Sequence, residues 1–243
     1  MALVIVCGLG EIGKPLYNIL RRTYDTRGVD VQPQEFDSPC SVLHICYPFQ
    51  IPDFLGETVR YIEKYRPGLV IINGTVVPGI TRQVHEASGG QPVAYSPVRG
   101  KHAKMEQDML FYRKFVAGVD DTSTQVAEKH FADAGFRTDR FPNLESGELA
   151  KLLETTYLGV LVGWAQEVER IAARYGANFD DVNSFVREVA FLPSQVFPGV
   201  IGGHCVMPNI ALLQSQIQSK FLDAIAESNE QKKSVMAAGG APR

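Results

Sequence analysis

Two short stretches of the chain hold residues whose types and spacing suit chemistry. Residues 3–13 read LVIVCGLGEIG, an apolar run that ends in the spacing Gly8, Gly10 and Gly13. Far along the chain, residues 202–205 read GGHC and place Cys205 in a run of small residues. A glycine-rich turn between a strand and a helix is typical of a dinucleotide site, and a thiol in an open loop can serve as a nucleophile. Together the two stretches indicate a redox enzyme with a covalent step.

Each glycine of the first stretch has its own role in a dinucleotide motif. The first permits the turn, the second lets the backbone approach the pyrophosphate, and the third allows close packing of helix on strand. The helix that follows would offer its first N–H groups to the phosphates. We therefore expect residues 8–13 to bind the cofactor, namely Gly8, Leu9, Gly10, Glu11, Ile12 and Gly13. The alternative is a turn of the same shape that binds no nucleotide.

An acidic residue lies where such a motif requires one. Asp30 falls near the end of the next predicted strand, residues 27–31. Its carboxylate would accept hydrogen bonds from the ribose hydroxyls of NAD and would repel the 2′-phosphate of NADP. The sequence therefore favours NAD, although Arg22 and Arg27 lie nearby and leave NADP open.

The elements that must position these residues alternate between strand and helix. Strands are expected at 2–7, 27–31, 41–47, 68–73, 92–96 and 114–118, with helices at 13–23, 52–65, 79–87 and 122–135. Continuous apolar strands alternating with helices favour an α/β fold, a Rossmann-type doubly wound parallel sheet covered on both faces. We expect this NAD-binding domain to cover residues 1–145.

The pattern changes at Ser146. Residues 147–175 contain no proline and show apolar residues at helical spacing, so they predict one long helix with Ser146 as its cap. A shorter helix is expected near 179–189, and Pro208 is expected to introduce a final helix that ends near 226. We expect a smaller all-α domain at 146–226 and a disordered polar tail at 227–243.

Bulk properties narrow the class of protein. A hydrophobic content of 45% is ordinary for a globular chain, and a formal charge of −3 gives no basic surface for nucleic acid or an anionic membrane. No apolar run is long enough for a membrane span, and the N-terminal strand is not a signal peptide. The four cysteines lack zinc spacing, so no metal is expected, and two of them lie in predicted buried strands, which suits a reducing cytoplasm.

Taken in order, these segments resemble the UDP-glucose/GDP-mannose dehydrogenase family over roughly residues 2–215. The family-like segments are residues 8–13, 28–31, 44–48, 75–81, 96–97, 148–152 and 202–205. The resemblance implies an NAD-dependent enzyme that oxidises the primary alcohol of a nucleotide sugar to a carboxylate with two NAD. In that chemistry a cysteine binds the aldehyde as a thiohemiacetal, a second hydride transfer gives a thioester, and water hydrolyses it.

The resemblance also assigns roles to single residues. Cys205 matches the nucleophile, and Lys151 matches the lysine that stabilises developing oxyanions. Thr75 matches a threonine beside the nicotinamide, and Tyr47 and Pro48 belong to a cofactor-binding segment. Substrate contacts are expected from the residues around the helix and loop, namely Thr155, Gly203, His204 and Asn209.

Several positions depart from the family pattern. Val98 stands where the family has a glutamate that handles the hydrolytic water, Thr155 where it has asparagine, and Asn209 where it has aspartate. The family also continues into a second Rossmann-like domain for the nucleotide of the sugar, which this chain is expected to lack. We therefore expect a divergent substrate, or a reaction that stops at a two-electron step.

Two other functions fit the same residues. The related β-hydroxyacid dehydrogenases join a Rossmann domain to a long helix with a catalytic lysine, so a small hydroxy-acid dehydrogenase would use Lys151 and not Cys205. A non-catalytic NAD-binding protein is the third possibility. In each case we expect a homodimer built on the long helix, because one small domain covers only one of its faces. The expected contact residues are Leu158, Leu161, Trp164, Val168 and Ile171.

Overall fold

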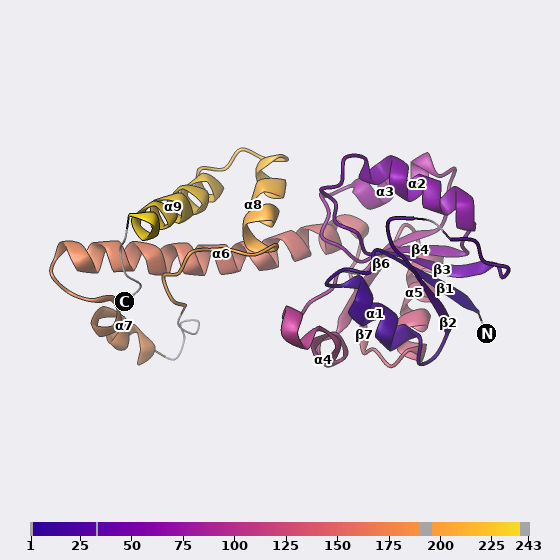
Figure 1. The fold of residues 1–243 in the computed structure, drawn as a ribbon, viewed down its shortest axis with the longest axis horizontal. Coiled ribbons are helices and arrows are strands. Elements are labelled where there is room, and N and C mark those ends of the chain that lie inside the picture. Colours follow the sequence, from indigo (N-terminus) through magenta and orange to yellow (C-terminus); the bar gives the residue numbers. More distant parts are fainter. Residues whose placement is uncertain (1, 33, 190–195, 239–243) are drawn as a thin grey trace. The chain divides into compact units, whose positions relative to one another are not determined.

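The computed structural model describes residues 2–32, 34–189 and 196–238, and it divides the chain into two compact units, Met1–Lys151 and Leu152–Arg243. The first unit is an α/β domain and the second is helical (Figure 1). The expected change of character near residue 145 therefore lies close to the observed division. Among the described residues, no helix is both long and apolar enough to cross a membrane.

The first unit is built on a seven-stranded sheet with the order β2-β1-β3-β4-β5-β6-β7. Its strands are β1 (Leu3–Cys7), β2 (Asp25–Val29), β3 (Cys40–Ile45), β4 (Leu69–Ile72), β5 (Val93–Tyr95), β6 (Lys114–Gly118) and β7 (Thr138–Arg140). All neighbouring strands are parallel except β5 and β6. The mostly parallel Rossmann-type sheet is confirmed, and the antiparallel β6 is a difference that the sequence did not predict.

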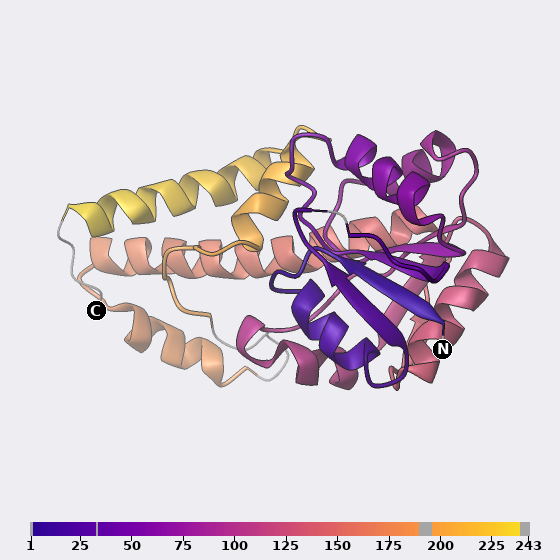
Figure 2. The same cartoon turned by 45° about the vertical axis from the view of Figure 1, so that its right-hand side comes forward.

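Helices cover both faces of the sheet. They are α1 (Gly13–Leu20), α2 (Phe54–Tyr65), α3 (Ile80–Ala87), α4 (Met105–Phe111) and α5 (Asp121–Asp133). Alternate residues of β1 face opposite sides of the sheet. Leu3, Ile5 and Cys7 pack in the core with α2 and α3, whereas Val4 and Val6 pack in the other core with α1, α4 and α5. Figures 1 and 2 show this three-layer arrangement. Burial on both faces explains why β1 and β4 are apolar at every position.

The second unit contains most of the long helix α6 (Leu144–Arg174), followed by α7 (Phe179–Arg187), α8 (Val206–Gln214) and α9 (Lys220–Ala237). Its core is formed by aliphatic residues of α6, α8 and α9 and of the loop before α8, namely Leu152, Ile201, Val206, Ile210, Leu213, Leu222 and Ile225. Helix α9 lies along α6, where Arg170 donates to the Ser228 hydroxyl at 3.0 Å and Lys232 pairs with Glu169 (Figures 1 and 2).

Helix ends differ from the sequence predictions at three places. Helix α6 begins at Leu144, two residues before the predicted cap Ser146. The capping side chain is that of Asn143, which accepts a hydrogen bond from the Ser146 N–H at 2.8 Å. The expected single C-terminal helix is two helices, because Ser219 caps a new helix by accepting from the Leu222 N–H. Helix α9 continues to Ala237, so the expected tail is helical from 227 to 237, and 239–243 lie outside the described residues.

Candidate dinucleotide site and cysteine loop

In the turn after β1, two of the three glycines lie too close to other backbone atoms for any side chain to fit. Gly8 has a φ of +88°, and a Cβ there would lie 2.6 Å from the Tyr47 backbone nitrogen. A Cβ on Gly13 would lie 1.7 Å from the Gly8 carbonyl oxygen. A Cβ on Gly10 meets no protein atom within 4 Å. The fold therefore requires Gly8 and Gly13, and it leaves open space at Gly10, where the motif places a pyrophosphate.

The first turn of α1 has no side-chain cap. Its N-cap residue Ile12 offers no side-chain acceptor, and its first turn holds no acidic residue. By contrast α2, α5 and α7 are capped by Asp53, Asp120 and Asn178. Uncapped N–H groups at a helix N-terminus favour a bound negative charge. In α1 the Lys14 N–H donates to the Gly10 carbonyl at 3.0 Å and Pro15 has no N–H, so an anion bound here would meet the backbone of the turn at residues 8–13.

Asp30 follows directly after β2 and its side chain is exposed. Its carbonyl oxygen accepts a hydrogen bond from the Tyr61 hydroxyl at 3.1 Å, which fixes the backbone at the strand end. Gly28, two residues earlier, lies under Leu9 of the turn, since a Cβ there would come within 2.8 Å of the Leu9 side chain. The strand that bears Asp30 is therefore packed against the glycine turn.

The other expected cofactor residues lie at the same edge of the sheet, the carboxyl ends of β3 and β4. Tyr47 is half-buried, and its hydroxyl hydrogen-bonds that of Thr58 at 2.7 Å, while burial raises the pKa of the phenol. Its ring is thus used in packing and its backbone touches Gly8. Pro48 is exposed, and Thr75 is half-buried in the loop between β4 and α3.

A buried polar cluster lies beneath this edge, and the sequence did not predict Lys114 and His130 as its members. Lys114 is 4% exposed, and its ammonium donates to the carbonyl oxygens of Ser96 at 2.7 Å and Pro97 at 3.0 Å. Burial lowers the pKa of Lys114 to about 7. The lysine ties β6 to the loop that contains Val98, and Val98 is itself buried in the core.

Histidines complete this cluster. His44 is fully buried, and its Nε2 lies 2.9 Å from the Nε2 of His130, while its Nδ1 lies 3.1 Å from the Asn73 amide nitrogen. His44 is therefore a core histidine with a polar partner at each ring nitrogen. His130 could not be predicted as its partner, because it lies on α5, 86 positions away.

Glu148 on α6 is a second buried charge. Its carboxylate accepts hydrogen bonds from the Gly79 N–H at 2.6 Å, the Thr81 N–H at 3.0 Å and the Thr81 hydroxyl at 2.6 Å. Burial raises the pKa of Glu148, and these three donors lower it. The side chain joins α6 to the start of α3, at the end of the loop that bears Thr75. Lys151 follows one turn later on α6, half-buried, and is the last residue of the first unit.

In the second unit, Cys205 is exposed and occupies the N-cap position of α8. Gly203 before it adopts a φ of +76°, a left-handed conformation that favours glycine, and His204 is exposed. The structure brings together two of the residues that depart from the family pattern. The amide of Asn209, which is buried, donates to the Thr155 hydroxyl at 2.8 Å and links α8 to α6.

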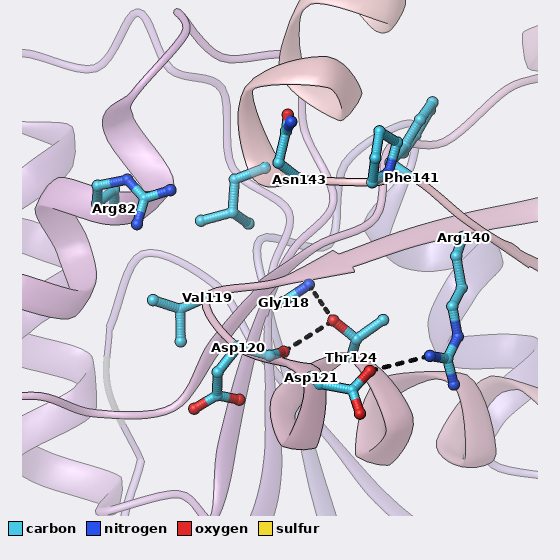
Figure 3. A pocket seen from close by; sticks show the side chains of 11 residues that line it. Arg82, Gly118, Val119, Asp120, Asp121, Thr124, Arg140, Phe141 and Asn143 are labelled. Carbon is cyan, nitrogen blue, oxygen red and sulfur yellow. Dashed lines mark hydrogen bonds and ion pairs between the residues drawn. The ribbon is translucent and has the colours of Figure 1, made fainter.

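A cleft of about 550 Å³ in the first unit lies elsewhere (Figure 3). It is lined by the ends of β6 and β7 and the start of α6, and because β6 runs antiparallel to β5, it opens at the sheet edge opposite the glycine turn. Arg140 pairs there with Asp121, and Arg82 pairs with Glu145. No expected site residue lines this cleft. Over the described ranges, no three His, Cys, Asp or Glu side chains are grouped as a metal site would require.

Comparison with known proteins gives matches in sequence and in structure. Residues 145–231 match the model of the UDP-glucose/GDP-mannose dehydrogenase family, central domain. A UDP-N-acetyl-D-mannosamine dehydrogenase of Pyrococcus horikoshii is 26% identical over 199 residues, which are 76% of this chain and 47% of that protein. The chain thus spans about half the length of this curated relative.

Solved structures share the fold. The UDP-D-ManNAc dehydrogenase from Pyrococcus horikoshii superposes with a TM-score of 0.85 at 21% identity, over 98% of this chain and 70% of that one. A 3-hydroxyisobutyrate dehydrogenase of Mycobacterium tuberculosis superposes with a TM-score of 0.70 at 16% identity, over 98% of this chain and 94% of that one. With the central-domain match, these findings confirm the resemblance that the motifs indicate: the chain is related to the UDP-glucose/GDP-mannose dehydrogenase family.

Proposed function

We propose that this chain binds NAD at residues 8–13 and takes part in the oxidation of an alcohol or aldehyde carried by a nucleotide sugar or a smaller substrate. The observation that carries the proposal is the open space at Gly10 beside an uncapped α1, in a turn whose other glycines the fold itself requires. The relationship to nucleotide-sugar dehydrogenases supports the reaction class.

Each expected residue has a role that its chemistry allows. The carboxylate of Asp30 would hold the adenosine ribose, and Thr75 would line the nicotinamide side. The ammonium of Lys151 would stabilise an oxyanion, and the thiolate of Cys205 would attack the aldehyde carbon, favoured by the N–H groups at the start of α8. NAD, when bound, accepts the hydride that leaves the substrate carbon. Thr155, Gly203, His204 and Asn209 would contact the substrate.

The buried Val98 supports a reaction that does not reach efficient thioester hydrolysis. Its side chain is apolar and packed in the core, so it offers no group to order or deprotonate a water. Loss of a positioned general base lowers rates about 10²- to 10⁴-fold. The measurement is the NADH yield with UDP-glucose and related sugars, alongside mass spectrometry of Cys205. A stalled adduct supports the proposal, and two NADH per sugar at ordinary rates contradicts it.

The binding step is tested by Gly10→Ala. Because a Cβ there meets no protein atom, the variant should keep its thermal stability while its affinity for NAD falls at least about tenfold. Gly199→Ala is the matched control, since its Cβ is equally unobstructed and lies in the second unit. Unchanged NAD affinity in Gly10→Ala, measured by titration calorimetry, would rule out this turn as the pyrophosphate site.

A small hydroxy-acid dehydrogenase is the second candidate. It is favoured by the structural match to a 3-hydroxyisobutyrate dehydrogenase, whose chain is covered over 94% of its length. Such an enzyme would depend on Lys151 and would not need Cys205. Activity that survives Cys205→Ala and is lost in Lys151→Ala would select it over the leading proposal. An inactive wild type that still binds NAD would select a non-catalytic NAD-binding protein.

A further inference from the structure

The loop before Cys205 has little packing of its own. Residues 196–205 form no helix or strand. Three of them are glycines, and a Cβ built on Gly199, Gly202 or Gly203 would meet nothing within 4 Å. Ile201 alone is buried in the core of the second unit. A glycine-rich segment of this kind has high conformational entropy, so its position must be fixed by specific contacts.

Two buried amide side chains supply those contacts. Asn229 on α9 is fully buried, and it accepts from the Ile201 N–H at 2.7 Å and donates to the Ile201 carbonyl at 3.1 Å. Gln166 on α6 is also fully buried, and it donates to the Gly199 carbonyl at 2.7 Å. The Ser228 hydroxyl donates to the other end of the Gln166 amide at 2.8 Å and fixes its orientation. A side-chain amide paired with both polar groups of one residue imitates a neighbouring strand.

These contacts hold the chain on one side of Cys205, and a third amide holds it on the other. Ile201 lies four residues before the cysteine, and Asn209 lies four residues after it, bonded to Thr155. The anchored residues belong to the second unit, so the arrangement does not depend on the sheet domain. Only Gly202, Gly203 and His204 separate the Ile201 anchor from the thiol.

We propose that Asn229, supported by Gln166, is a positioning residue that fixes the Cys205 thiol at the N-cap of α8. The inference rests on the proposed role of Cys205 as nucleophile. Asn229 touches neither the thiol nor a substrate, and it acts through the backbone of Ile201. Without it, the N–H and carbonyl of Ile201 would lose their partners, and the glycine segment would leave its position.

The first experiment follows the loop directly and needs no activity. In Asn229→Ala, amide hydrogen exchange of the segment 197–204 should accelerate about tenfold or more, because two buried hydrogen bonds are lost. Ile225→Val is the matched control, since it loses a methyl group from the same helix and the same core. Should Asn229→Ala fail to fold, Gln166→Met removes the Gly199 contact at similar side-chain volume. Unchanged exchange in the variant that folds would overturn the proposal.

The second experiment separates positioning from a general loss of structure. Alkylation by iodoacetamide reports on Cys205, because Cys7, Cys40 and Cys46 are buried. It should be about threefold slower in Asn229→Ala, since the reactive thiolate loses the helix N–H groups, and unchanged in Ile225→Val. In an active enzyme kcat should fall with little change in KM for NAD. Faster exchange with unchanged alkylation would overturn the positioning role, whereas normal activity of Cys205→Ala would overturn the proposed nucleophile alone.

Discussion

At the scale of a single residue, Asp30 is the side chain that we expect to set the cofactor preference. Its exposed carboxylate follows β2, beside the glycine turn. We predict tighter binding of NAD than of NADP, and a loss of that preference of about tenfold in Asp30→Asn, because the neutral amide no longer repels the 2′-phosphate. Fluorescence titration of both reduced cofactors measures the ratio, and Asp37→Asn is the control. Equal affinity of the wild type for the two cofactors would contradict the assignment.

The histidine pair makes the first unit sensitive to acid. The Asn73 amide donates to His44 Nδ1, so the other nitrogen of His44 carries the proton that it donates to His130 Nε2. A further proton on either ring would place two N–H groups face to face. Burial lowers the pKa of His130 to about 4 and lowers that of His44 well below its ordinary value.

The folded state therefore binds fewer protons than the unfolded chain below pH 6.5. The contribution of the two histidines to stability should be constant above that pH and fall as the pH drops toward 4, by about 2 kcal/mol at pH 5 for His130 alone. Urea unfolding at pH 5 and pH 7 measures the difference. His130→Gln should flatten the dependence, and His204→Gln, an exposed position, should not. An equal free energy of unfolding at pH 5 and pH 7 would refute the prediction that His44 and His130 are both neutral in the folded protein.

At the scale of elements, Glu148 joins α6 to α3. We predict that Glu148→Ala destabilises the protein by about 2–4 kcal/mol, because three donors at Gly79 and Thr81 lose a buried acceptor. Glu148→Gln should have a smaller effect, since its amide oxygen still accepts. The control is Glu145→Gln, whose ion pair with Arg82 is partly exposed and contributes about 0–1 kcal/mol. Equal unfolding midpoints for the alanine variant and the wild type would show that the Glu148 contact with α3 does not stabilise the protein.

Elements with a strong apolar pattern could be predicted, and those defined by contacts could not. Strands β1, β3 and β4 are continuous apolar runs that end at turns, so their bounds came within two residues. Strand β7 (Thr138–Arg140) is short and polar, and it exists because β6 pairs with it. Helix α4 lies in a charged stretch and is placed by Met105 and Met109 in the core.

The same contrast holds for the site residues. The glycine turn has a local signature, so it was found from spacing alone. Lys114, Asn229 and Gln166 have no signature, because their partners lie 17 to 62 positions away and buried polar residues resemble surface ones in a sequence. A buried polar side chain with satisfied hydrogen bonds can be recognised only in the folded structure.

At the scale of the whole molecule, an apolar stripe follows α6. It comprises Leu153, Tyr157, Trp164, Ile171 and Tyr175, which are 46–80% exposed and are separated by four or seven residues. Of the residues expected at a dimer contact, Leu158, Trp164 and Ile171 are exposed, and Leu161 and Val168 are half-buried. Spacing of four and seven places side chains on one face of a helix.

We predict that this stripe mediates a homodimer, because a stripe of large apolar side chains on one face of a helix is commonly covered by association. Trp164→Glu should give a monomer in light scattering at micromolar concentration. Val126→Glu, an exposed apolar residue on α5, should leave the mass unchanged. A monomeric wild type under these conditions would contradict the prediction.

The three glycines of the turn should respond differently to selection, because the fold restricts Gly8 and Gly13 and does not restrict Gly10. In a library of variants selected only for a folded chain, positions 8 and 13 should remain glycine, because any Cβ there collides with backbone atoms. Position 10 should change to other residues, since a Cβ there meets nothing within 4 Å. Only selection for the bound nucleotide would restore glycine at position 10. The residue at this position in descendants of the protein would thus record whether cofactor binding has been kept.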